Sequence, residues 1–281
     1  FGAGSTWGEI FIFKLPLLAT DFLMLYFMMR LYPGHRRTIG IVCFASPILL
    51  YASYMHGQLD AIPTAFLLGA IYFLLSRRRT AVFWFALFYG AALLTKMHIL
   101  AAAPLFVIYL YNKRDWRKLT ALLVLLPALF ILLCATVGTS GFWHSVLLNK
   151  EQSLITAVYL SFGDLKLYIP VVILAWLYLQ TYMLRNIGND LFVGLLALVF
   201  GVFLVFVPPM PGWYVWIVPF LAAFFVTVAD NKRKNLAVTG LLCILYLLYF
   251  LTAHDGGMVD LYFGNQDLSF IKTDLPAYKN G

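Results

Sequence analysis

The stretch YMHGQLDAIPTAF, residues 54 to 66, places His56, Gln58 and Asp60 between two long runs of apolar residues. The rest of the chain is strongly apolar, since 63% of its 281 residues are hydrophobic, 11% are charged and the mean hydropathy is +0.87. A soluble domain carries about 25% charged residues. The sequence therefore predicts an all-α, polytopic integral membrane protein in which HGQLD interrupts two membrane helices.

Polar breaks of this kind divide the chain into ten apolar segments. They run over residues 10–32, 38–55, 61–76, 80–95, 98–112, 119–139, 166–184, 191–208, 213–230 and 235–253. Several are shorter than the roughly 20 residues that cross a bilayer, so tilted or broken helices are expected. We predict about ten transmembrane helices in one domain, residues 1–253, and a tail over 254–281. Residues 140–165 mix aromatic and polar side chains, which predicts a helix in the headgroup plane.

The basic residues predict the orientation of these segments, because cytoplasmic loops accumulate Lys and Arg. Alternate breaks hold most of the 20 basic residues: Arg30, Arg36 and Arg37; Arg77, Arg78 and Arg79; Lys113, Arg114, Arg117 and Lys118; Arg185; and Lys232, Arg233 and Lys234. This alternation puts HGQLD, residues 140–165 and the tail on the extracytoplasmic side. The net charge of +8 is then a signal of topology, and no nucleic-acid partner is expected.

Besides Arg30 near its end, the first segment contains two charged residues, and a charged residue at the centre of a membrane helix costs about 2.5–3.5 kcal/mol on insertion scales. Asp21 lies well inside residues 10–32, and Lys14 precedes it on nearly the same helical face. The helical rise separates them by about 10.5 Å, so a bend at Pro16 or a bridging neighbour is expected. Such a group is either a structural helix–helix contact or part of a pathway for a substrate or ion.

The HGQLD stretch has a structural interpretation beside a functional one. Asp60 fits the N-cap of the next helix, whose first turn contains Pro63. Capping leaves His56 and Gln58 unexplained, because neither residue is needed to turn the chain. These three polar side chains are therefore candidate site residues.

Two further extracytoplasmic turns carry candidate side chains. LLTKMHILAAAP, residues 93–104, contains Lys96 and His98, and Lys96 either reaches up to the interface or binds an anion. PGWYVW, residues 211–216, contains Trp213, Tyr214 and Trp216, which are typical of an aromatic belt and also of sugar stacking. No HxxxH or HExxH spacing indicates a metal ion.

Together these motifs resemble a known family. HGQLD and the later ALLTKMHILAAAPLFVIYLY, residues 92–111, resemble the H-x-Q-Y-N and K-x-x-x-L-x-x-x-P segments of polyprenyl-phosphate-sugar-dependent glycosyltransferases of the GT-C superfamily. The dolichyl-phosphate-glucose glucosyltransferases and their bacterial relatives are the most similar. FKLPLLATDFLMLY, residues 13–26, is similar to a family helix with a basic residue before a membrane-embedded aspartate, which places Lys14 and Asp21. The resemblance runs from about Phe11 to Leu251.

The resemblance implies inverting transfer of a sugar from a polyprenyl-phosphate donor to a glycan, lipid or protein acceptor, without a metal or other cofactor. His56 and Gln58 stand at the family's His and Gln, Asp60 at its Asn, and Lys96 at its Lys. Lys96 is the implied phosphate ligand, and the other three position the sugar or phosphate. The active face would be extracytoplasmic, in a bacterial inner membrane or the endoplasmic reticulum, with membrane lipids around it.

Two departures from the family pattern affect the expected site. The acidic residue usually taken as the catalytic base precedes the helix matched by residues 10–32, so it would lie upstream of Phe1. Asp60 and Glu9 are the fallback bases. The family's H-x-H-E-K segment falls near residues 211–216, where this chain has PGWYVW, so its donor and acceptor contacts do not carry over.

Two other functions are compatible with the sequence. A transporter or flippase of a lipid-linked sugar or small solute would couple Lys14 and Asp21 to an ion or a headgroup. An inverted repeat or paired broken helices would favour it, and inspection of the sequence reveals neither. A lipid-linked glycan polymerase or ligase would be expected to use arginines in a large extracytoplasmic loop.

Overall fold

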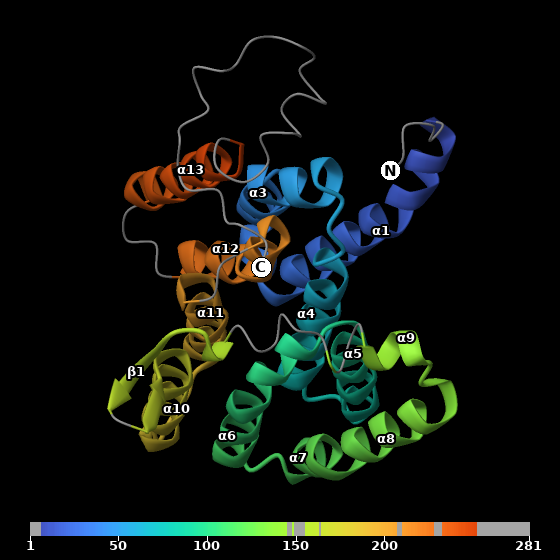
Figure 1. The fold of residues 1–281 in the computed structure, drawn as a ribbon, viewed down its shortest axis with the longest axis vertical. Helices are drawn as coiled ribbons and strands as arrows, with labels where there is room; N and C mark the ends of the chain where they lie inside the picture. Colours follow the sequence, from blue (N-terminus) through green and yellow to red (C-terminus); the bar gives the residue numbers. More distant parts are fainter. Residues whose placement is uncertain are drawn as a thin grey trace.

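The computed structural model describes residues 7–144, 148, 155–162, 164–206, 210–227 and 232–251 (Figure 1). These residues are mostly helical, as predicted. Two helices are long and apolar enough to cross a membrane, Trp116–Thr136 and Asn189–Phe206. Lys14–Leu31 and Pro33–Cys43, bent by 112° at their junction, would form a third span if they act together. The helical, membrane-compatible character is therefore confirmed, whereas ten spans stay a prediction.

The segment predicted as one helix over residues 38–55 is divided in the structure. Helix α1 (Trp7–Leu31) is followed by a 3-10 turn, Pro33–His35, and by α2 (Arg36–Ile39), which continues into a π-helical stretch, Gly40–Phe44. The chain then breaks at Ser46, which is extended with ψ 125°, before α3 (Pro47–Leu49) and a second π-helical stretch, Leu50–Met55. Pro47 explains the break, because proline lacks an N–H and disfavours the helical conformation in the residue before it.

The centre of the molecule is the antiparallel pair α4 (Ala61–Leu75) and α5 (Ala81–Thr95), which lie side by side. Their bounds agree with the predicted segments 61–76 and 80–95 to within one residue. Helix α1 also packs against α4, and Phe27 of α1 meets Phe88 of α5 edge to face at 5.2 Å. Gly69 of α4 permits this contact, because a Cβ there would overlap Phe88. Each helix of the pair is about 22 Å long, less than the roughly 30 Å hydrocarbon core of a bilayer.

The remaining helices surround this pair (Figure 1). They are α6 (Ala103–Lys113), α7 (Trp116–Thr120), α8 (Leu126–Val137), α9 (Ser140–Phe142), α10 (Ile169–Met183), α11 (Asn189–Phe206), α12 (Val218–Thr227) and α13 (Lys232–Tyr249). A π-helical stretch, Ala121–Leu125, joins α7 to α8. Two 3-10 segments, Met97–Ala102 and Pro211–Trp216, precede α6 and α12. Both 3-10 segments contribute to the candidate site.

A β-hairpin corrects the prediction of an all-α fold. Strand β1 (Tyr159–Phe162) pairs antiparallel with β2 (Leu165–Tyr168), and α10 begins only at Ile169. The headgroup helix predicted over 140–165 is therefore wrong at its C-terminal end. In the sequence, aromatic and aliphatic residues on both sides of Gly163 and Asp164 favour strands over a helix. The middle of that segment and the tail 254–281 lie largely outside the described residues.

The turns after α4, α6 and α10 lie together at one end of the molecule. Lys118 Nζ donates hydrogen bonds of 2.7 Å to the backbone oxygens of Leu74 and Ser76, at the end of α4. The same ammonium lies 3.0 Å from the carboxylate of Asp115. Asn112, in the last turn of α6, donates through Nδ2 to the backbone oxygen of Leu184 at 3.1 Å. Lys118 is thus a buried helix cap rather than a surface charge.

Lys118→Met should destabilise the protein, because it leaves two helix-end carbonyls and a carboxylate without their donor. We expect a loss of about 2–3 kcal/mol in the free energy of unfolding and a thermal midpoint lower by roughly 5 °C. Thermal unfolding in detergent, followed by tryptophan fluorescence, measures the change. Lys113→Met removes an exposed lysine of the same turn and should leave the midpoint within 1 °C or so. Equal midpoints for the two variants would contradict the capping role.

Candidate functional site

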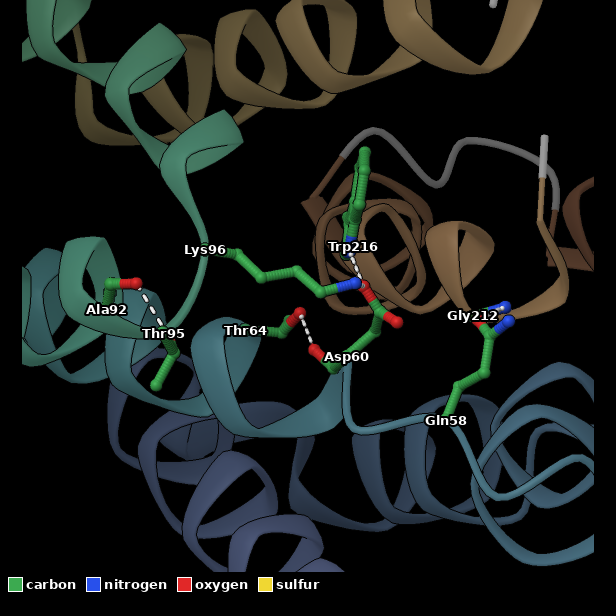
Figure 2. A network of polar contacts seen from close by, with 8 residues as sticks. All are labelled: Gln58, Asp60, Thr64, Ala92, Thr95, Lys96, Gly212 and Trp216. Atoms are coloured by element: carbon green, nitrogen blue, oxygen red, sulfur yellow. Dashed lines mark hydrogen bonds and ion pairs between the residues drawn. The ribbon is translucent and has the colours of Figure 1, made fainter. Parts of the chain in front are cut away.

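The candidate site centres on Asp60, whose buried carboxylate lies at the N-terminus of α4 (Figure 2). Its Oδ1 accepts hydrogen bonds of 2.8 Å from Lys96 Nζ and 2.8 Å from Trp216 Nε1. The site therefore joins three elements, namely the turn before α4, the turn after α5 and the 3-10 segment Pro211–Trp216. Asp60 holds the predicted N-cap position, but its side chain makes no capping hydrogen bond. The reason is its helical backbone, φ −66° and ψ −18°, whereas a capping residue is usually extended.

Lys96 is aimed at Asp60 by a break in the helix. Helix α5 ends at Thr95, and Lys96 is extended, with φ −152° and ψ 129°. Its side chain then spans the gap to Asp60, as Figure 2 shows, and this ion pair replaces the interpretation of Lys96 as a residue that only reaches the interface. The side chain of Lys96 is 35% exposed to solvent, whereas that of Asp60 is 2% exposed. The pair is a partly accessible cation held by a buried anion.

Gln58 and Gly212 form the second contact between the HGQLD stretch and the PGWYVW stretch. The backbone N–H of Gly212 donates to Gln58 Oε1 at 2.5 Å. A Cβ at residue 212 would overlap the Gln58 side chain and lie 2.6 Å from Asp60 Oδ2, so this approach requires glycine. Gly57, with φ +75°, supplies the turn that brings Gln58 into place. Gln58 is half-buried, and its Oε1 accepts the backbone N–H of Gly212. The side-chain amide nitrogen of Gln58 is therefore the group that can donate to a ligand.

Aromatic rings form a stack beside the carboxylate. The Trp216 ring lies on His98 with centroids 3.6 Å apart and an interplanar angle of 15°, and Trp213 stacks on Trp216 at 5.2 Å. Both tryptophans are buried, at 6% and 4% exposure, so the aromatic-belt interpretation is wrong for them. Tyr214 packs instead on Tyr246, with ring centroids 5.0 Å apart.

His98 lies in the 3-10 turn between α5 and α6. Its pKa is lowered well below the usual value, first by burial and second by the nearby Lys96 ammonium, so the ring is neutral. Its Nε2 is buried and has no hydrogen-bond partner among the residues that the structure describes. A neutral ring nitrogen in this position can accept from, or donate to, a ligand group.

A second polar group lies against the same loop. Lys14 Nζ donates to the backbone oxygen of Tyr54, and the Tyr54 hydroxyl donates to Asp21 Oδ2 at 2.6 Å. The prediction that a neighbour bridges Lys14 and Asp21 is therefore confirmed. Asp21 is buried, and its Oδ1 has no hydrogen-bond partner within the described ranges. The bridging residue lies two positions before His56, so both polar groups contact one stretch of chain.

Two further predicted site residues lie on neighbouring elements. His56 is half-buried where the π-helical stretch ends. Glu9 lies in the first turns of α1, and its side chain is outside the described part of the structure. Conversely, the sequence analysis missed Trp216 and Gly212 as direct partners of Asp60 and Gln58. The only signal was the PGWYVW motif itself, because side-chain orientation in a 3-10 turn does not follow from sequence spacing.

Gly212→Ala should disrupt the site, because the new methyl group would displace Gln58 from its backbone donor. We expect a loss of about 2 kcal/mol in the free energy of unfolding. Gly194→Ala is the matched control, since a Cβ at residue 194 in α11 meets no atom within 4 Å. Alanine is favoured over glycine in a helix by about 1 kcal/mol, so the control should be neutral or stabilising. A Gly212→Ala variant as stable as the wild type would contradict the close packing.

Comparison with known proteins adds no family to this geometry. No protein-family model, curated protein or solved structure matches the chain. Among the described residues, no three His, Cys, Asp or Glu side chains gather as metal ligands would. The function has to be argued from the ion pair at Asp60, its aromatic surroundings and the residues of the HGQLD stretch.

Proposed function

We propose that this protein is a membrane glycosyltransferase that transfers a sugar from a polyprenyl-phosphate-linked donor to an extracytoplasmic acceptor. The observation that carries the proposal is Lys96, a partly exposed ammonium fixed by the buried Asp60 carboxylate. An ammonium has three N–H donors. Within the described residues Nζ donates one hydrogen bond, to Asp60, so its remaining donors suit the oxygens of a phosphate.

In this reaction Lys96 would bind the leaving group, which is the lipid phosphate. The bond between the anomeric carbon and the phosphate oxygen breaks, and negative charge develops on the lipid phosphate. A fixed cation beside a buried, aromatic wall stabilises that charge more strongly than it would in water. The acceptor hydroxyl attacks the opposite face of the anomeric carbon and loses its proton to a base, which gives inversion.

Asp60 is the positioning residue in this proposal. A buried carboxylate whose Oδ1 accepts hydrogen bonds from both Lys96 and Trp216 is suited to orient the ammonium. The role of base then falls to Glu9, the other fallback base. The Gln58 amide nitrogen and the neutral His98 ring are the candidate ligands for sugar hydroxyls.

The proposed membrane arrangement follows from the α4–α5 pair. The Asp60–Lys96 ion pair lies at one end of these antiparallel helices, and the Lys118-capped basic turns lie at the other. If the basic turns face the cytoplasm, Asp60 and Lys96 face the opposite side. The proposal therefore places the active face outside the cytoplasm in a multi-pass protein with about ten spans, of a bacterial inner membrane or the endoplasmic reticulum.

Lys96→Met should weaken binding of undecaprenyl phosphate, the probe for the lipid-phosphate product. Loss of one charge-assisted contact predicts a dissociation constant raised roughly 10- to 100-fold. Quenching of tryptophan fluorescence in detergent measures binding, with undecaprenol as the ligand that lacks phosphate. Lys166→Met, which removes an exposed lysine of the hairpin, is the control and should bind as the wild type does. A folded Lys96→Met variant with unchanged affinity would remove the basis of the proposal.

A transporter or flippase is the second candidate, favoured by the buried Asp21 carboxylate and its unsatisfied Oδ1. Vesicles containing the protein and a fluorescent undecaprenyl phosphate analogue distinguish the two functions. A transferase should move no lipid between leaflets. A transporter should move it, and Asp21→Asn should reduce the rate at least tenfold while keeping the hydrogen bond from Tyr54. Movement of the analogue that depends on Asp21 would overturn the transferase proposal.

A further inference from the structure

A group of exposed basic side chains lies at the end of the molecule opposite Asp60. This basic face consists of Arg77, Arg78 and Arg79 after α4, Lys113, Arg114 and Arg117 around the α6–α7 turn, and Arg185 after α10. All seven are exposed. The hydrogen bonds of Lys118 and Asn112 described above hold the three turns together. The basic face is therefore formed by the fold, which brings together turns that are distant in the sequence.

The charge of the basic face is poorly neutralised by the protein itself. The acidic residue within its three turns is Asp115, which is paired with buried Lys118 and accepts the backbone N–H of the same lysine at 3.3 Å. Asp190, in the first turn of α11, is the first acidic residue after Arg185 in the sequence. The exposed cations therefore exceed the neighbouring acids, and an anionic partner is expected.

Exposed aromatic and apolar side chains continue from the basic face along the helices. Trp116 is 55% exposed and Tyr111 is 50% exposed, and their rings meet edge to face at 5.9 Å. Tyr182, three residues before Arg185, is 59% exposed, and Val124, farther from the basic face in the stretch that leads into α8, is 63% exposed. A bilayer presents anionic headgroups, then the interface, then hydrocarbon. Cations, amphipathic aromatic rings and apolar side chains suit these three layers in that order. A nucleic acid or a free phosphate would leave the exposed apolar side chains without a binding partner.

We propose that the basic face binds the headgroups of anionic phospholipids, with their acyl chains lying along α8 and α10. Guanidinium groups suit this partner because they bind phosphate oxygens through two parallel N–H donors. The lipid would hold the turns after α4, α6 and α10 against one leaflet, and through the α4–α5 pair it would fix the depth of the Asp60 site. The inference does not depend on the proposed transferase activity.

The test titrates the purified full chain in detergent with dioctanoyl phosphatidylglycerol, dioctanoyl phosphatidylcholine or glycerol phosphate. The thermal unfolding midpoint, followed by tryptophan fluorescence, reports binding. We expect phosphatidylglycerol to raise the midpoint by several degrees and the other two ligands to leave it within 1 °C or so. An equal rise with phosphatidylcholine, or with glycerol phosphate, would overturn a site for anionic lipid.

Charge-matched variants locate the site. The triple variant R77Q/R78Q/R79Q should require a roughly tenfold higher concentration of phosphatidylglycerol for the same shift in the unfolding midpoint. The reason is that each basic residue near an anionic headgroup contributes to the binding free energy. The control K232Q/R233Q/K234Q removes the same charge from another basic stretch and should respond as the wild type does. If both triple variants lose the response equally, net charge alone explains it and the proposed face is wrong.

Discussion

A buried carboxylate needs donors, and Asp60 recruits them from remote parts of the chain. Lys96 is 36 residues away and Trp216 is 156 residues away, yet both donate to the same Oδ1. An ionised group in such surroundings is strongly unfavourable without these contacts. The end of α5 and the segment Pro211–Trp216 are therefore bound to the start of α4, and the orientation of Lys96 follows from that requirement.

The HGQLD stretch connects two polar groups because its backbone is irregular. Tyr54, near the end of a π-helical stretch, contacts Lys14 and Asp21, while Gly57 turns the chain so that Gln58 and Asp60 face the PGWYVW segment. A regular helix would distribute these side chains around its circumference. The irregular backbone presents them to α1 on one side and to the 3-10 segment on the other. Movement of this stretch would therefore change both groups together.

The sequence predicts the parts of this arrangement that depend on local patterns. Helices α4 and α5, and the location of Asp60 and Lys96 at the same end of that pair, follow from apolar length and from one intervening turn. The hydrogen bond from Trp216 does not follow, because it depends on long-range packing. Two local predictions also differ from the structure. Pro47 divides an apolar run that was predicted as one helix. Helical backbone angles at Asp60 prevent the side-chain capping that aspartate favours.

The length of the α4–α5 pair bears on the kind of substrate that reaches Lys96. Two 15-residue helices rise about 22 Å, whereas the hydrocarbon core is roughly 30 Å thick. With the basic turns held at one headgroup layer, the ion pair would lie several ångströms below the opposite layer. A water-soluble sugar nucleotide would have to leave the aqueous phase to reach that depth. In the proposed function, a donor anchored by a polyprenyl chain would bring its phosphate to the lysine from within the bilayer, and the short helices agree with such a substrate.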